Sequence, residues 1–175
     1  MKSSLSLWQF AGFVFTSLFG TLFHFLYEWT KSVAFAPFCA VNESTWEHMK
    51  IIFFPMLIFA VIEYFVWGKN EPCFWWIKCI GIVIGTLLVP ILFYTYNGAF
   101  GKSPDFVNVL IFFISAGLAY WIETWLFKAD VLLYKASFIA VLILSIWGVA
   151  FVYFTFAPLT LPIFQDPVTL RYGLK

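Results

Sequence analysis

One polar segment, residues 42–48, carries the side chains best suited to chemistry. It reads Asn-Glu-Ser-Thr-Trp-Glu-His and stands immediately before a long apolar run. Two carboxylates, from Glu43 and Glu47, lie within a few residues of the imidazole of His48. Ionisable groups at the edge of hydrocarbon are costly, so their presence calls for a partner, a ligand or a substrate. The segment therefore predicts a polar site at the end of a membrane helix.

A second polar pair, His24 and Glu28, has the i, i+4 spacing of residues that share one side of a helix. Small residues at four-residue spacing precede it, at Gly12, Thr16 and Gly20. Such a stripe lets helices approach closely, so it predicts that this side of the helix faces the bundle. His24 then points inward as a packed side chain, a metal ligand or a proton carrier.

Together, the two histidines and the nearby carboxylates could hold a divalent metal. Two histidines and one carboxylate resemble a catalytic zinc set, which leaves a position open for water. The expected metal ligands are His24, Glu28 and His48. The expected acid and base groups are Glu43, Glu47 and His48.

Helix initiation is an alternative explanation for part of the polar segment. Residues 44–47 match the capping box S-x-x-E. In that motif the hydroxyl of Ser44 accepts from the amide of Glu47, and the glutamate reaches back to the amide of residue 44. The motif leaves Glu43 and His48 unexplained.

Other polar residues fall near the ends of apolar runs. Tyr94 and Tyr96 are expected at the level of His48, either as headgroup anchors or as hydrogen-bond donors to a substrate. Glu63 and Glu123 lie toward the opposite face. They either point inward, where they could carry protons or bind a cation, or pair near the headgroups with Lys69, Lys78 or Lys128.

Composition identifies the chain as an integral membrane protein. Of its 175 residues 63% are hydrophobic and 11% are charged, which is far too apolar for a soluble domain. A net charge of +1 gives no electrostatic case for a nucleic-acid partner. The chain has no G-x-S-x-G elbow, phosphate-binding glycine loop or C-x-x-C pair, so Cys39 is the one remaining candidate for a nucleophile.

Five apolar runs are long enough to span a membrane, so the expected fold is an all-α bundle of five transmembrane helices in a single domain, residues 1–175. The expected location is the cell membrane, in multi-pass form. The runs cover residues 5–27, 51–67, 74–96, 106–127 and 136–157, with a long loop at 28–50 and a proline-rich tail at 158–175. Five crossings place both histidines, the loop, the end of the third run and the tail on one face. Lys and Arg near the span ends divide five to five, which leaves the orientation open.

Four segments of the chain carry a resemblance to a known family. They are F-H-F-L-Y-E-W at 23–29, V-N-E-S-T-W-E-H at 41–48, F-Y-T-Y-N-G at 93–98 and L-P-I-F-Q-D-P-V-T-L-R-Y-G at 161–173. The chain resembles a functionally uncharacterised family of small bacterial multi-spanning membrane proteins with an N-E-S-x-W-E-H motif. The resemblance implies a single multi-span domain and a prokaryotic origin. It supplies no activity.

Three function classes are open at this point. The first is a membrane enzyme, such as a metal-assisted hydrolase or transferase acting on a lipid-like substrate that enters from the bilayer. The second is a binding or transport subunit for a small polar solute or cation, with a path continued by Glu63 and Glu123. The third is a structural partner in a larger membrane complex.

Overall fold

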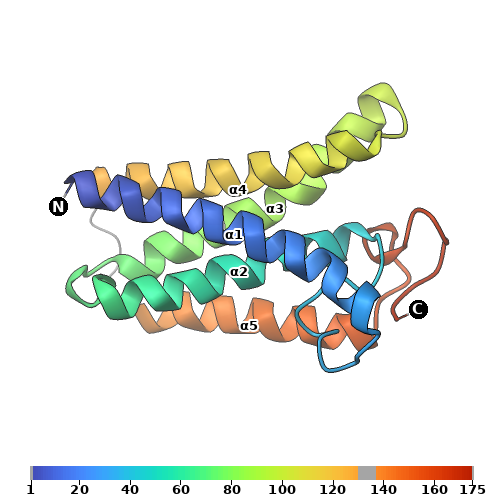
Figure 1. Cartoon of the computed structure of the whole chain (residues 1–175), viewed down its shortest axis with the longest axis horizontal. Helices are drawn as coiled ribbons and strands as arrows, with labels where there is room; N and C mark the ends of the chain where they lie inside the picture. The colour runs from blue at the N-terminus through green and yellow to red at the C-terminus, as the bar shows by residue number, and fades with distance from the viewer. Residues whose placement is uncertain (1, 130–136, 175) are drawn as a thin grey trace.

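The computed structural model describes residues 2–129 and 137–174, and five long helices account for most of that part of the chain. They are α1 (Lys2–Thr30), α2 (Thr45–Val66), α3 (Phe74–Phe100), α4 (Asp105–Lys128) and α5 (Ser137–Phe156), with 3-10 turns η1 (Gly68–Asn70) and η2 (Pro162–Phe164). Successive helices run in alternate directions along the bundle (Figure 1). Each of the five is long and apolar enough to cross a membrane. The predicted all-α bundle of five transmembrane helices is confirmed.

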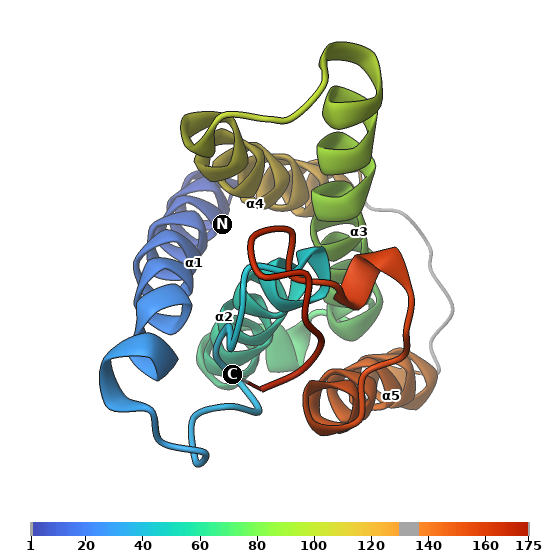
Figure 2. The same ribbon diagram turned by 90° about the vertical axis from the view of Figure 1, so that its right-hand side faces the viewer.

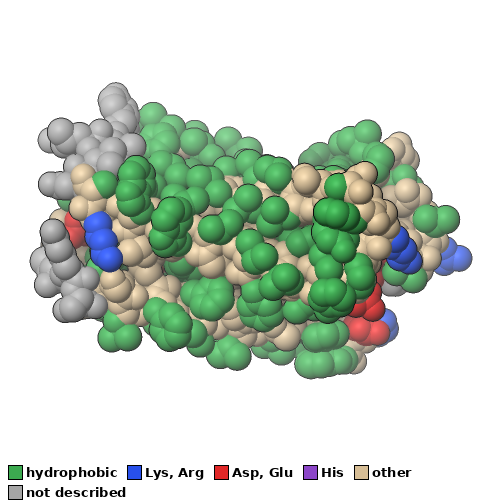
Figure 3. All heavy atoms as spheres, turned by 90° about the horizontal axis from the view of Figure 1, so that it is seen from above, with side chains coloured by type: hydrophobic (Ala, Val, Ile, Leu, Met, Phe, Trp, Pro, Cys, Tyr) green, Lys and Arg blue, Asp and Glu red, His purple; other side chains and the backbone are tan. Residues whose placement is uncertain are grey.

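The outer surface matches a membrane environment. In the view of Figure 3, apolar side chains cover the middle of the molecule, and charged side chains gather at its two ends. The side chains that carry this surface include Phe10 and Leu18 of α1, Trp121 of α4 and Val149 of α5, each more than half exposed. A belt of this kind is the surface that lipid chains solvate.

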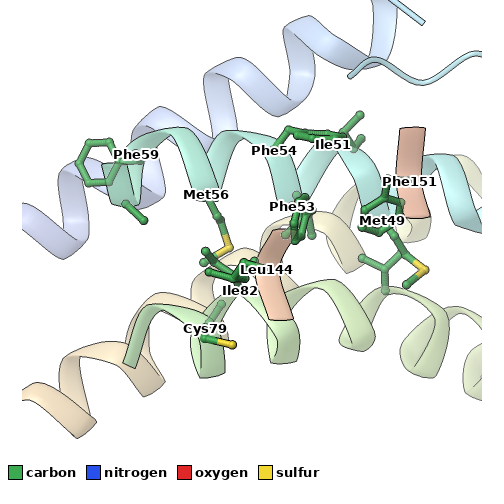
Figure 4. Packing of buried hydrophobic residues seen from close by; sticks show 14 of the residues in the cluster. Met49, Ile51, Phe53, Phe54, Met56, Phe59, Cys79, Ile82, Leu144 and Phe151 are labelled. Atoms are coloured by element: carbon green, nitrogen blue, oxygen red, sulfur yellow. The ribbon is translucent and has the colours of Figure 1, made fainter. Parts of the chain in front are cut away.

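Helix α2 lies at the centre of the bundle (Figure 2) and packs against each of the other four helices. Its side chains Phe53 and Met56 are buried and point toward Ile82 of α3 and Leu144 of α5 (Figure 4). Because α2 contacts all four of the other helices, its polar groups at either end meet partners from several helices. This central position is what gathers the candidate site.

The central helix begins earlier than the apolar run that predicted it. The run indicated a start at residue 51, whereas α2 begins at Thr45, with Ser44 as its N-cap. The Ser44 hydroxyl accepts a hydrogen bond from the Glu47 amide at 3.4 Å, as the capping box predicts. The return bond from the glutamate is replaced, because Asn42 Oδ1 accepts from the Ser44 amide at 2.8 Å. The connection to α1 is consequently shorter than predicted, covering residues 31–44.

The fifth helix and the tail follow the prediction where they can be compared. The apolar run at 136–157 corresponds to α5, and residue 136 itself lies outside the described residues. The tail after α5 folds back over the end of the bundle that also carries the α1–α2 loop (Figures 1 and 2). Its Phe164 ring packs on Trp46 of α2 at 4.6 Å between centroids, and the Gly173 carbonyl accepts from Asn42 Nδ2 at 2.8 Å.

The small residues of α1 face the bundle. Thr16 is fully buried and its hydroxyl shares a 2.9 Å hydrogen bond with the hydroxyl of Tyr120 on α4. At Gly20 an added Cβ would lie 2.5 Å from the Phe112 ring and 2.7 Å from the carbonyl oxygen of Ile51. The stripe therefore sets how closely α1 approaches α2 and α4, and His24 follows on the same side one turn later.

We expect Gly20→Ala to lower the free energy of unfolding by about 1–3 kcal/mol, because the new methyl group clashes with a backbone oxygen that cannot rotate away. The matched control is Gly117→Ala in α4, where the added Cβ would meet Phe13 at an ordinary 3.7 Å. That control should be neutral or slightly stabilising, since alanine is the better helix former. Unfolding by SDS titration in mixed micelles measures both. Equal stability of the two variants would contradict the close packing at Gly20.

Candidate functional site

The loop between α1 and α2 is fixed to both helices, and this positions the carboxylate of Glu43. The Ala40 amide donates to the carbonyl of Phe23 at 3.0 Å, which returns the loop to the last turns of α1. The Asn42 side chain then caps the Ser44 amide and holds the backbone at the entrance to α2. Glu43 lies between these two fixed points, so its side chain is delivered beside the end of α1.

Three side chains converge there. The Nε2 atoms of His24 and His48 lie 3.8 Å and 3.6 Å from Oε2 of Glu43. The two imidazole rings meet edge to face, with 5.2 Å between centroids. One ligand atom from each residue lies within 4.8 Å of the others, and all three side chains are partly exposed. The structure thus brings His24 and His48 together, with Glu43 as the carboxylate between them.

The hydrogen bond at Nδ1 of His48 determines whether its other ring nitrogen, Nε2, carries a lone pair. Its Nδ1 lies 2.9 Å from the carbonyl oxygen of Ser44, one turn earlier in α2. A carbonyl only accepts, so this contact requires the proton on Nδ1. In the neutral ring, Nε2 then presents a lone pair toward the Glu43 carboxylate. Two acceptors that face each other are joined by a proton on the ring, by a metal ion or by a bridging water molecule.

The cluster opens onto a cavity of about 600 Å³. The cavity has a polar part, formed by His24, Glu43, His48, Asn97, Lys102, Ser103, Asp105 and Asn108. Its remaining lining is mostly apolar and comes from all of α1 to α4 and from the tail, including Phe25, Ile51, Val89, Phe93, Val109, Ile111, Phe112, Phe113, Pro167 and Val168. The turn between α3 and α4 leans away from the end of α2 on this side of the molecule (Figure 1). The site is therefore an amphipathic cavity with the His-Glu-His cluster on one wall.

Further polar residues of the lining come from the end of α3 and the start of α4. Asn97 on α3 bonds Ser103 twice, with its Oδ1 accepting from the Ser103 amide at 2.8 Å and its Nδ2 reaching the hydroxyl at 3.3 Å. The Ser103 hydroxyl donates in turn to Asn108 Oδ1 at 2.7 Å. This network ties the end of α3 to the start of α4. A sequence signal was present, because Val89, Phe93 and Asn97 recur at helical spacing on one side of α3.

The predicted tyrosines and Glu28 lie apart from the cluster. Tyr94 is 42% exposed, and neither it nor Tyr96 lines the cavity, because Phe93 and Asn97 occupy the inward side of that turn of α3. Glu28 is exposed on the last turn of α1. It is one helical turn beyond His24, and the His-Glu-His cluster takes its carboxylate from Glu43 instead.

Glu47 faces away from the cavity and is 2% exposed. Its Oε2 lies 2.6 Å from Lys50 Nζ and accepts from the Val41 amide at 3.1 Å. Lys50, which is fully buried, also donates to the Ala36 carbonyl at 2.9 Å and to the Thr155 hydroxyl at 2.7 Å. The pair therefore joins the loop, α2 and α5, which is a structural contribution to the site.

Cys39 lies in the same loop with 1% of its surface exposed. Burial raises the pKa of its thiol to about 11, against the attraction of the nearby Lys50 ammonium, which lowers the pKa. At neutral pH the nucleophilic thiolate is then a very small fraction. The thiol packs with Tyr27, Ala36 and Val41, in a small apolar cluster beneath the loop.

At the end of the bundle away from the cavity, Glu63 and Glu123 are both buried and paired with a lysine, which the sequence offered as alternatives. Glu63 and Glu123 point inward and are fully buried, and both pair with Lys78 of α3. The expected partners Lys69 and Lys128 are exposed. Burial and pairing thus occur together at the far end of the bundle from the cavity.

Comparison with known proteins places the chain in a family. None of the curated proteins and none of the solved structures gives a significant match. A family model does match, over residues 1–174, and its description is a family of unknown function, DUF6512. The bacterial origin and the N-E-S-x-W-E-H motif implied by the resemblance stay predictions. Since the match spans nearly the entire sequence, the chain is a member of the DUF6512 family of unknown function.

Proposed function

We propose that this protein is a membrane enzyme that hydrolyses a lipid-like substrate, or transfers a group from it, with a zinc ion bound by His24, Glu43 and His48. The observation that carries the proposal is the pair of opposed acceptors, His48 Nε2 and Glu43 Oε2, at the wall of an amphipathic cavity. Glu28 and Glu47, which the sequence also suggested, have no place in this ligand set.

The spacing of the three ligand atoms supports a tetrahedral metal. Zinc bonds of about 2.0–2.2 Å place neighbouring ligand atoms roughly 3.4 Å apart. The distances of 3.6 and 3.8 Å from Glu43 Oε2 to the two imidazoles need only small side-chain rotations to reach that value. The bond from His48 Nδ1 to a backbone carbonyl is the outer contact that metal-bound histidines usually make. Three protein ligands leave the fourth position for water or substrate, which is what a hydrolytic zinc site requires.

The cavity supports a substrate with a polar head and an apolar chain. Its polar lining also includes the Asn108 amide and the Lys102 ammonium, and these groups suit the oxygens of an ester or phosphate head. The apolar lining around Phe93, Ile111 and Phe112 lies along membrane-spanning helices, where it suits a hydrocarbon chain. The proposal does not distinguish an acyl ester from a phosphoester.

Metal analysis of purified protein tests the proposal first. Protein purified in detergent and exposed to zinc should retain stoichiometric zinc after desalting, measured by inductively coupled plasma mass spectrometry. His24→Ala and His48→Ala should each lower retained zinc at least tenfold, because two ligands hold zinc far more weakly than three. The matched control is Glu28→Gln, which changes an exposed carboxylate on the helix that carries His24 and should leave zinc unchanged.

Activity is tested with the zinc-loaded protein in vesicles of phosphatidylethanolamine and phosphatidylglycerol. We expect release of fatty acid or of a headgroup product, detected by mass spectrometry, and loss of that release with EDTA or in His48→Ala. Absence of zinc in wild-type protein, with both histidines titrating as ordinary imidazoles, would overturn the metal site. Bound zinc without any lipid product would overturn the enzyme assignment.

A further inference from the structure

At the end of the bundle opposite the cavity, four of the five helices contribute to one buried polar cluster. Gln9 comes from α1, Glu63 from α2, Lys78 from α3, and Glu123 and Tyr120 from α4. None of these side chains is more than 4% exposed. The proposed enzyme chemistry makes no use of them, and so many buried polar groups inside a membrane bundle indicate a function of their own.

The charges of the cluster do not balance. Lys78 Nζ contacts Oε2 of Glu63 and lies 2.5 Å from Oε2 of Glu123. One ammonium therefore faces two carboxyl groups, and full ionisation would leave an excess negative charge in the bundle. A net charge buried in a low-dielectric interior is strongly unfavourable. The cluster must hold one further cation.

The hydrogen bonds show which carboxyl group carries it. Each oxygen of Glu63 has a partner. Gln9 Nε2 donates to Oε1 at 3.0 Å, and the Lys78 ammonium makes an ion-pair contact with Oε2 that lacks the geometry of a hydrogen bond. Glu123 meets Lys78 through Oε2, and its Oε1 is buried without a hydrogen-bond partner among the described residues. An oxygen that receives no donor is the natural position for a proton.

Space at that oxygen favours a proton over a metal ion. Glu123 is packed against Gly81 of α3, so closely that an added Cβ would lie 2.2 Å from Oε1. A sodium or calcium ion would need several oxygen ligands around it at more than 2 Å, whereas a proton needs no additional volume. The glycine thus leaves room for the carboxyl group and little beyond it.

Aromatic rings close the side of the cluster that faces away from the cavity, and polar groups lie on the side that faces the cavity. On the side away from the cavity, the centroids of the Phe74 and Phe127 rings lie 5.8 Å from Lys78 Nζ, and Trp67 packs on both rings. Toward the cavity lie buried hydroxyl groups, in the order Tyr120 with Thr16, then Ser115 and Thr86.

Two of these hydroxyl groups are placed at one level between the cluster and the cavity. Thr86 follows Lys78 by eight residues and Ser115 precedes Glu123 by eight, so on antiparallel helices both lie about 12 Å from the cluster. Both are fully buried, and neither hydroxyl has a hydrogen-bond partner among the described residues. The cavity-lining Val89 and Ile111 follow within about one further turn. Unpaired buried hydroxyl groups at this level are the partners that transient water molecules need.

We propose that Glu63, Lys78 and Glu123 form a proton-binding site, in which Glu123 holds one proton that exchanges with the cavity along the hydroxyl groups of Thr16, Tyr120, Ser115 and Thr86. The site is independent of the zinc cluster, and it stands whether or not that cluster binds metal. It provides this end of the bundle with a reservoir for one proton.

Infrared spectroscopy of the full chain reconstituted in lipid tests the site, with the proton itself as the probe. Wild-type protein at neutral pH should show the C=O stretch of a protonated carboxyl group, and Glu123→Gln should abolish it. Glu63→Gln should abolish it too, because one ammonium then faces one carboxylate and Glu123 ionises. The control Glu71→Gln alters a carboxyl group outside the cluster and should leave the band unchanged. A wild-type spectrum without the band at neutral pH, or a band that persists in both variants, would overturn the proposal.

Transfer into D2O tests the route. The band should shift as the proton is replaced by deuterium, and Ser115→Ala combined with Thr86→Val should slow that shift severalfold. If Glu123→Gln does not fold, the proposal is still tested by the loss of the carboxyl band in Glu63→Gln and by the rate at which the wild-type band shifts in D2O. A band that never shifts in folded wild-type protein would mean that the proton is sealed in, and the proposal would fail.

Discussion

Replacing Lys50 by methionine is expected to lower the free energy of unfolding by about 3–5 kcal/mol, because it leaves the carboxylate of Glu47 buried and unpaired. Lys50 Nζ lies 2.6 Å from Glu47 Oε2, and both side chains are almost completely buried. The substitution also removes the donor to the Ala36 carbonyl, which costs about a further 1–3 kcal/mol if no water reaches it. Unfolding by SDS titration, followed by tryptophan fluorescence, measures the loss.

The double variant Glu47→Gln/Lys50→Met separates charge from packing. It removes both ions, so we expect it to recover most of the stability lost in the single variant. Lys102→Met, which changes an exposed lysine, is the matched control and should stay within about 0.5 kcal/mol of wild type. A double variant as unstable as Lys50→Met alone would mean that the bonds to Ala36 and Thr155, and not the ion pair, hold the loop.

Replacing Lys78 by methionine should have a still larger effect, about 5 kcal/mol or more near neutral pH. The ionised carboxyl group of the Glu63–Glu123 pair loses the ammonium that neutralises it, and the protonated one loses a donor. The folded variant would then need both Glu63 and Glu123 protonated. The unfolded chain holds those groups ionised at neutral pH, so folding takes up protons, and the stability of the variant should fall as pH rises and recover as pH falls. Folded yield and unfolding between pH 5 and pH 8 would reveal this slope.

The triple variant Glu63→Gln/Lys78→Met/Glu123→Gln is the control for the second experiment. It replaces all three ions by neutral side chains of similar size, and it should fold with a stability that hardly changes over the same pH range. If Lys78→Met is as stable as wild type at pH 8, the two carboxyl groups do not depend on the lysine. The charge balance described for the cluster would then be incorrect.

Much of the fold could be predicted from the sequence, because each span is an apolar run of about the length that crosses a bilayer. The apolar run begins six residues after the first residue of α2, and only the capping box at residues 44–47 indicated the earlier helix start. The first turns of α2 contain Glu47 and Lys50, which look like loop residues to any measure of hydropathy. Their burial depends on each other and on the Ala36 carbonyl from the preceding loop, a contact that local sequence does not reveal.

The sequence indicated where the candidate site lies but not which carboxylate joins the two histidines. Helical spacing correctly turned His24 toward the bundle, yet the same spacing suggested Glu28 as its partner. The structure instead brings Glu43 to the two histidines, because hydrogen bonds from Ala40 and Asn42 fold the loop back. Such bonds join residues of a loop whose path no periodic pattern describes. On α3, the helical spacing of Val89, Phe93 and Asn97 indicates that Phe93 and Asn97, and not the tyrosines, lie on the side that faces the cavity.

The tail that closes over the loop end of the bundle bears on how the protein is made. Residues 161–173 follow α5 in the chain, so all five helices are synthesised before this part of the tail. Pro167 and Val168 complete the cavity wall, and Phe164 must dock on Trp46 to bring them there. A nascent chain stalled after α5 would therefore carry both histidines in an unfinished cavity, and the cavity wall would be completed only as a late step of biogenesis.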